Sequence, residues 1–155
     1  CRFFLQKADR LIQRGAAAEL SATPTSAFVA DLTGANLLRG RAAARPDGLT
    51  VVALDGGGEV LSTDSASGRS TLSIQPWEVV LEASEVEPAG SSMQNHLRAE
   101  VSSLTAIGNR VRVGLSLPQP LVAEVTKAAV ARLDLAPGKP VTASFKASAA
   151  RLYAR

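Results

Sequence analysis

The chain has 155 residues, 46% of them hydrophobic and 20% charged, and these proportions exclude an intrinsically disordered protein because enough apolar surface is present to build a core. Its single cysteine excludes an internal disulfide framework. The sequence has no apolar run of about 18 residues and no secretory leader, so we expect neither a membrane span nor export. The net charge of +3 is spread along the chain, so it does not predict a nucleic-acid partner.

Residues 1–35 predict helical or irregular structure. Apolar residues recur at helical spacing in CRFFLQKADRLIQRG and again in SAFVADLTG. In the second stretch Ser26 is a candidate N-cap and Gly34 a candidate stop signal. We therefore expect this segment to differ from the rest of the chain.

Residues 36–90 predict a first β subdomain. Short alternating or apolar runs occur here, namely NLLRGRAAA, LTVVALD, EVLSTDS and STLSIQ. The stretches RPDG, DGGG and ASG separate them and are typical of tight turns. A segment rich in Pro, Gly, Ser and Glu, EASEVEPAGSS, indicates a seam near residue 90.

Residues 91–155 predict a second β subdomain. LRAEVSSLTAI and NRVRVGLSL alternate and join through Gly108 and Asn109, and PLVAEV follows as a third strand. Thr126 is the candidate N-cap of a short helix in TKAAVARLDL, which Pro137 and Gly138 are expected to end. KPVTASFKAS then supplies the last long strand.

Strands interrupted by one short helix predict an all-β fold made of one or two small barrels of the oligonucleotide/oligosaccharide-binding (OB) kind. Periodicity alone leaves a small β-sandwich open as the alternative. Direct matching of residues reveals no internal repeat, although both halves offer about the same number of strands.

No catalytic constellation is evident in the sequence. A Gly-Lys-Ser/Thr phosphate loop is missing, and DGGGEV is more typical of a hairpin turn. His96 is the only histidine and has no cysteine nearby, so we predict no metal site and interpret it as a surface or loop residue. Trp77, after Pro76, is interpreted as a packing anchor. We therefore expect no enzyme activity in this chain.

Near its start, the chain resembles the exit from the nucleotide-binding domain of ABC importer ATPases of the sulfate and molybdate group. That family carries a Q-x-G-x-x-x-E-L element, followed by P-x-S-x-F-V-A and G-x-N. The matching residues are Gln13, Gly15, Glu19, Leu20, Pro24, Ser26, Phe28, Val29, Ala30, Gly34 and Asn36. The resemblance implies that residues 1–35 are the tail end of such a domain.

From Ser91 to Leu152 the chain is similar to the molybdate-binding module called Mop or TOBE. The family pattern opens with Ser-x-Arg-Asn-x-Leu, continues with a Thr before a short helix containing L-x-L-x-x-G, and ends in a strand with Lys-Ala. Its counterparts here are SSMQNHLRAEV, VTKAAVARLDLAPG and ASFKAS. SIQPWEVVL also resembles the family's I-R-P-E-D-V-x-L turn. The resemblance implies that residues 36–90 and 91–155 together form a regulatory region of TOBE/Mop type, with the oxyanion-binding subdomain in the second.

Molybdate or tungstate is the ligand that this resemblance implies. A tetrahedral dianion needs short hydrogen-bond donors from several directions and at least one cation. Lys146 can supply the charge, and the helix start at Thr126 can present backbone N–H groups. The candidate ligands are Ser92, Gln94, Asn95, Thr126, Lys146 and Ala147.

Each candidate also has a structural interpretation. Thr126 can act only as an N-cap, Asn95 can hold the turn through its side chain, and Lys146 can be an ordinary solvated lysine. Two positions depart from the family pattern: Gln94 replaces an Arg, and Ala129 replaces a Ser found in some members. Loss of the Arg removes a fixed charge and a bidentate fork.

The resemblance implies a bacterial regulatory region that senses internal molybdate or tungstate and modulates transport. It would pair as a homodimer, reach the membrane permease through the parent ATPase domain, and lie at the cytoplasmic face of the cell membrane without inserting into it. The ATPase motifs of the parent would lie upstream of Cys1. The alternative is a dimerisation or partner-docking TOBE domain of a sulfate, sugar or polyamine importer that binds no oxyanion. The choice among molybdate, tungstate and sulfate stays open.

Overall fold

The computed structural model describes residues 3–7, 10–15, 34–84 and 91–154. Its first element is an antiparallel hairpin of β1 (Phe3–Lys7) and β2 (Arg10–Gly15). The helical prediction for this stretch is therefore wrong, because short apolar runs rich in Phe, Leu and Ile are also compatible with strands. The predicted N-cap Ser26 and the helix that Gly34 was expected to end lie outside the described residues; Gly34 itself has a φ of 84°.

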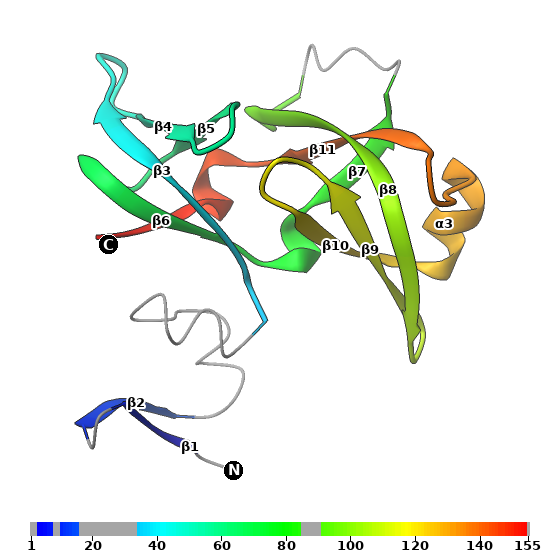
Figure 1. Cartoon of the computed structure of the whole chain (residues 1–155), viewed down its shortest axis with the longest axis horizontal. Coiled ribbons are helices and arrows are strands. Elements are labelled where there is room, and N and C mark those ends of the chain that lie inside the picture. Colours follow the sequence, from blue (N-terminus) through cyan, green and yellow to red (C-terminus); the bar gives the residue numbers. More distant parts are fainter. Residues whose placement is uncertain (1–2, 8–9, 16–33, 85–90, 155) are drawn as a thin grey trace.

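The remaining strands form two five-stranded antiparallel sheets (Figure 1). The first sheet has the order β12-β6-β3-β4-β5. Its strands are β3 (Asn36–Ala44), β4 (Thr50–Leu54), β5 (Glu59–Ser62), β6 (Gly68–Ile74) and β12 (Arg151–Ala154). The second sheet has the order β10-β9-β8-β11-β7. Its strands are β7 (Val80–Ala83), β8 (Asn95–Ile107), β9 (Arg110–Ser116), β10 (Leu121–Thr126) and β11 (Pro140–Phe145).

Short helical elements connect some of these strands. They are η1 (Pro76–Glu78), α3 (Lys127–Leu133) and η2 (Ala147–Ala149). The predicted N-cap of α3 is confirmed, because the Thr126 hydroxyl accepts a hydrogen bond from the Ala129 N–H at 3.0 Å. The prediction that Pro137 and Gly138 end this helix is wrong: the helix ends at Asp134, which adopts a left-handed conformation with φ 53°.

The all-β, OB-like prediction is confirmed, and the two sheets repeat one strand plan. Strands β3 to β7 and β8 to β12 occupy equivalent places in chain order, except that each half gives its last strand to the other sheet. Strand β7 thus pairs with β11, and β12, at the far end of the chain, pairs with β6 (Figure 1). The predicted boundary near residue 90 therefore does not separate the sheets. Residue matching missed this repeat because the two halves share their topology much more than their residues.

One hydrophobic core joins both sheets. The burial pattern of β9 alternates along the strand, which places Val111, Val113 and Leu115 inside. These residues belong to the same buried cluster as Leu38 and Leu72 of the first sheet. The exchanged strands and the shared core together hold the ends of β8 and β11 against the first sheet.

Candidate functional site

The ends of β8 and β11 bring most of the predicted ligands together. Asn95, the first residue of β8, pairs with Phe145, the last residue of β11. Gln94 directly precedes Asn95 and Lys146 directly follows Phe145, so each lies next to the last pair of this register, and Ser92 lies two residues before Gln94. The side chains of Ser92, Gln94 and Lys146 are exposed. The structure therefore gathers a serine, an amide and a lysine at one edge.

Thr126 does not lie at this edge. It pairs with Arg110, which in turn pairs with Ile107 at the opposite end of the 13-residue strand β8 from Asn95. At roughly 3.3 Å per residue the two ends of β8 are about 40 Å apart along the strand. Within one chain the structure therefore does not bring Thr126 and Lys146 together, because the β8–β9 hairpin carries the end of β10 away.

Asn95 has a structural task that the sequence left open. Its side chain is 2% exposed. Its Oδ1 accepts the Leu61 N–H at 2.7 Å, and its Nδ2 donates to the Leu61 carbonyl at 3.0 Å. Leu61 lies in β5, the edge strand of the first sheet. Asn95 thus clamps the opposite sheet and positions the loop before it.

Asn36 forms the equivalent clamp in the first sheet. Its Oδ1 accepts the Val122 N–H at 2.7 Å, and its Nδ2 donates to the Val122 carbonyl at 2.8 Å. Val122 lies in β10, the edge strand of the second sheet. A sequence signal for this pair exists, because Asn-x-Leu-Arg occurs at residues 36–39 and again at 95–98.

Ala147 and Lys146 divide the site into a fixed part and a charged part. Ala147 is 3% exposed, and its carbonyl accepts the Thr63 N–H at 3.3 Å, which ties η2 to the first sheet. Lys146 is exposed and forms no ion pair with any residue in the described part of the chain. The site thus presents an uncompensated cation on a rigid support.

His96 is more constrained than its interpretation as a surface or loop residue allows. It lies on β8, is half-buried, and uses both ring nitrogens. Its Nε2 lies 2.8 Å from the Met93 carbonyl oxygen and its Nδ1 lies 2.8 Å from the Ser144 hydroxyl. Ser144 in turn donates to Glu82 at 2.6 Å. The loop that carries Ser92 and Gln94 is therefore tied to β11 and β7.

Comparison with known proteins agrees with this architecture. Residues 91–152 match the family model of the TOBE domain. In this part the chain is similar to TOBE domains. The resemblance noted in the sequence is confirmed at that level.

Two relatives extend the comparison beyond the TOBE domain. The molybdate/tungstate import ATP-binding protein WtpC of Pyrococcus abyssi (strain GE5 / Orsay) is 28% identical over 146 residues, which is 93% of this chain and 40% of that protein. The chain therefore spans less than half of that relative's length. The cytoplasmic molybdate-binding protein ModG, in a form with molybdate bound, superposes with a TM-score of 0.66 over 77% of this chain and 96% of its own. The two sequences are 23% identical, so this structural likeness shows a shared fold.

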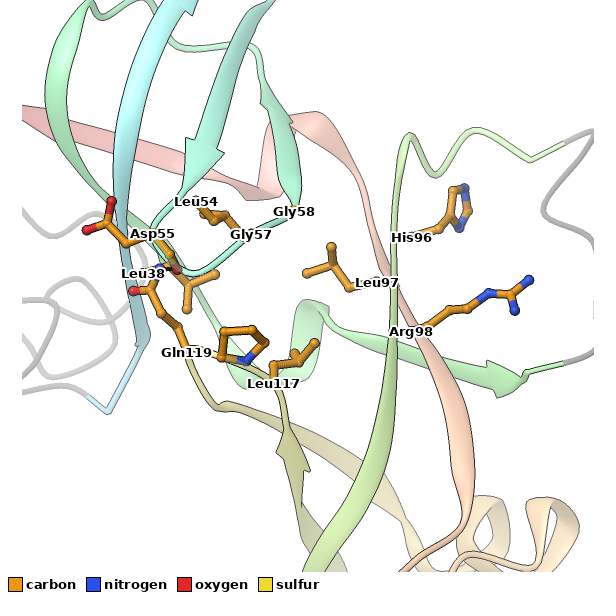
Figure 2. Close-up of a pocket in the computed structure, with 11 residues that line it drawn as sticks. Leu38, Leu54, Asp55, Gly57, Gly58, His96, Leu97, Arg98, Leu117 and Gln119 are labelled. Carbon is orange, nitrogen blue, oxygen red and sulfur yellow. Dashed lines mark hydrogen bonds between the residues drawn. The ribbon is translucent and has the colours of Figure 1, made fainter.

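A separate hollow lies between the first sheet, the start of β8 and the segment after β9 (Figure 2). Its volume is about 280 Å³, and its apolar lining includes Leu38, Leu54, Leu97 and Leu117. Figure 2 shows Leu97 pointing into the hollow, whereas the side chains of its neighbours on β8 project from the other side of the strand. His96 and Arg98 also line the hollow, but their side chains project away from the side that Leu97 enters. The leucines that fill this side offer a dianion neither donors nor positive charge.

Trp77 is 50% exposed, so its interpretation as a packing anchor is wrong. The described ranges contain no cluster of three or more His, Cys, Asp or Glu side chains that could hold a metal ion. No helix in those ranges combines the length and apolar character needed to cross a membrane.

Proposed function

We propose that this chain is the regulatory oxyanion-binding region of an ABC importer ATPase and that it binds molybdate or tungstate beside Lys146. The observation that supports the proposal is the pairing of Asn95 with Phe145, because Gln94 directly precedes Asn95 and the exposed Lys146 directly follows Phe145. The relation to a molybdate/tungstate import ATP-binding protein and the fold shared with a molybdate-binding protein support the ligand class.

The proposed site divides its work between ligands and supports. Lys146 supplies the charge, and the Ser92 hydroxyl and Gln94 amide supply neutral hydrogen bonds to the anion's oxygens. Asn95 and Ala147, both buried, hold the backbone on either side. Thr126 is left as a helix cap, because it lies at the other end of β8.

The regulatory part of the proposal concerns pairing. Two copies form a homodimer, the parent ATPase domain contacts the membrane permease, and the site lies at the cytoplasmic face of the membrane. Bound anion modulates transport only if it binds one dimer arrangement more tightly than the other. The chain itself performs no catalysis in this scheme, and nucleic acid is not a partner.

Calorimetric titration of the whole chain with molybdate, tungstate and sulfate tests the binding. The variant Lys146→Gln removes the cation and should weaken the affinity for molybdate by roughly 10- to 100-fold, because a hydrogen bond to a charged group contributes about 1.5–3 kcal/mol. Lys127→Gln is the matched control, since Lys127 begins α3 at the far end of the sheet. Absence of both heat and thermal stabilisation at millimolar anion would refute the proposal, as would equal losses in the two variants.

A second candidate, a TOBE domain that only pairs subunits or docks a partner, is favoured by one specific observation. Asn95 is buried and occupied by Leu61, and Gln94 carries no charge, so the loop contributes fewer ligands than the family pattern implies. Sedimentation of the chain with and without molybdate separates the two functions. A stable dimer that binds no anion would support the docking function.

A further inference from the structure

A chain of three hydrogen bonds crosses the second sheet beside the proposed site. It begins at the Met93 carbonyl, which lies 2.8 Å from His96 Nε2. It continues from His96 Nδ1 to the Ser144 hydroxyl at 2.8 Å and from that hydroxyl to Glu82 Oε1 at 2.6 Å. Ser144 is fully buried, and the two ionisable side chains, His96 and Glu82, are half-buried. The chain links the loop before β8 to β11 and to the exchanged strand β7.

Counting hydrogens shows that this chain needs an additional proton. The Met93 carbonyl can only accept, so His96 Nε2 must carry a hydrogen. Ser144 has a single hydroxyl hydrogen, which serves either His96 Nδ1 or Glu82 but not both. With neutral His96 and ionised Glu82, one of the three bonds therefore lacks a hydrogen. A proton on Nδ1, or on the Glu82 carboxyl, completes all three.

The charged groups around His96 act in opposite directions. Glu82 on β7 faces it through Ser144 and favours the added proton. Arg98 lies two residues along β8 and projects from the same side of the strand as His96 (Figure 2), and Lys146 follows β11; both disfavour a further positive charge. A bound dianion would offset these two cations. Proton uptake and anion binding should therefore favour each other.

We propose that His96 is a positioning residue, which in its protonated state holds the Met93 carbonyl and thereby the loop of Ser92 and Gln94, so that each bound oxyanion takes up one proton. The inference rests on the proposed function. The added charge also lies close to Gln94, where the family pattern has an arginine. Because one proton is taken up with each anion, the affinity for the anion falls as pH rises, by up to about ten-fold per pH unit.

Calorimetry of the whole chain with molybdate in two buffers of different ionisation enthalpy, Hepes and Tris at the same pH, measures the proton uptake. The wild-type binding heat should differ between the buffers by the difference of their ionisation enthalpies, which corresponds to the uptake of about one proton per anion. Glu82→Gln should abolish that difference, because the amide introduced there can donate an N–H to Ser144 and satisfy the chain with a neutral His96. His96→Gln should abolish it as well, since an amide can hold the Met93 carbonyl without titrating. Glu100→Gln, which alters an exposed carboxylate on β8 outside the chain of hydrogen bonds, should preserve it.

The outcomes separate this inference from the proposed function. If molybdate binds with the same heat in both buffers, the proton coupling is wrong and the anion site stands. If the buffer difference persists in both Glu82→Gln and His96→Gln, the proton is taken up elsewhere and His96 is not responsible. If no anion binds in either buffer, both proposals fall together.

Discussion

Each sheet has two neighbouring strands that end beside a clamping asparagine, and these two places differ by one charged residue. In the first sheet, β6 ends opposite Asn36 and is followed by Gln75; in the second, β11 ends opposite Asn95 and is followed by Lys146. Both asparagines clamp the edge strand of the other sheet. The asparagine clamp thus occurs in both sheets, whereas the lysine occurs only at the clamp of the second sheet. The clamp therefore belongs to the architecture, whereas the cation belongs to the proposed function.

A second difference concerns how each sheet secures its surface. The first sheet carries a bidentate ion pair between Arg69 and Asp55, with both nitrogen–oxygen distances at 2.8 Å. The strand repeat places Pro140 and Pro118 at the equivalent positions of the second sheet. Proline has no side-chain charge to pair, so the second sheet has no ion pair at this place. Its own ion pairs join Glu124 to Arg110 and Arg112.

Removal of the two clamps should have the largest effect. Asn36→Ala and Asn95→Ala each leave one N–H and one carbonyl of an edge strand without a partner. Since an unsatisfied buried group costs about 1–3 kcal/mol, each variant should lose about 2–4 kcal/mol of unfolding free energy in urea titrations. Asn95→Ala should also weaken molybdate, because Asn95 holds the loop of Gln94.

Equal destabilisation by the two alanine variants would show that the two clamps contribute equally to the free energy of unfolding, as their equivalent places in the two sheets suggest. A loss confined to Asn95→Ala would show instead that the second clamp alone carries the fold. Equal effects of the two variants on molybdate affinity would contradict a site local to the second sheet.

Restoring the family's arginine should have the next largest effect. Gln94→Arg adds a bidentate, charged donor beside Lys146 and should tighten molybdate by roughly 10- to 100-fold in calorimetric titration. Ala35→Arg is the matched control, because Ala35 precedes Asn36 as Gln94 precedes Asn95. Tightening by the control variant as well would indicate a general charge effect rather than a site at Lys146.

The sequence predicted the elements whose signals are local. The alternating run from Asn36, the turn at Gly108 and the cap at Thr126 all appear in the structure. Strand β12 was missed because its four residues pair with β6, about eighty residues earlier, and local pattern carries no information on such a partner.

The candidate site was predictable only in part, for the same reason. Sequence order placed Lys146 and Gln94 in one family pattern, and the sheet register pairs their neighbours, Phe145 and Asn95. The same pattern included Thr126, although no spacing rule records that a hairpin carries it to the opposite end of β8. The clamp of Asn95 depends on Leu61 in the other sheet, which only the fold reveals.

Loss of the ion pair in the first sheet should have the smallest effect, and it should depend on pH. The hydrogen bond from Arg69 holds the pKa of Asp55 below its ordinary value, so the pair stabilises the fold above about pH 4. That stability is lost as pH falls through the lowered folded-state pKa, because protonation of the carboxyl removes its charge. Asp55→Asn should therefore lower the melting temperature slightly at neutral pH and leave it unchanged in strong acid. Both groups are substantially exposed, so solvent screening keeps the difference small. A pH-independent difference would mean that Asp55 acts through packing rather than charge, and the contrast with the prolines of the second sheet would then lose its electrostatic meaning.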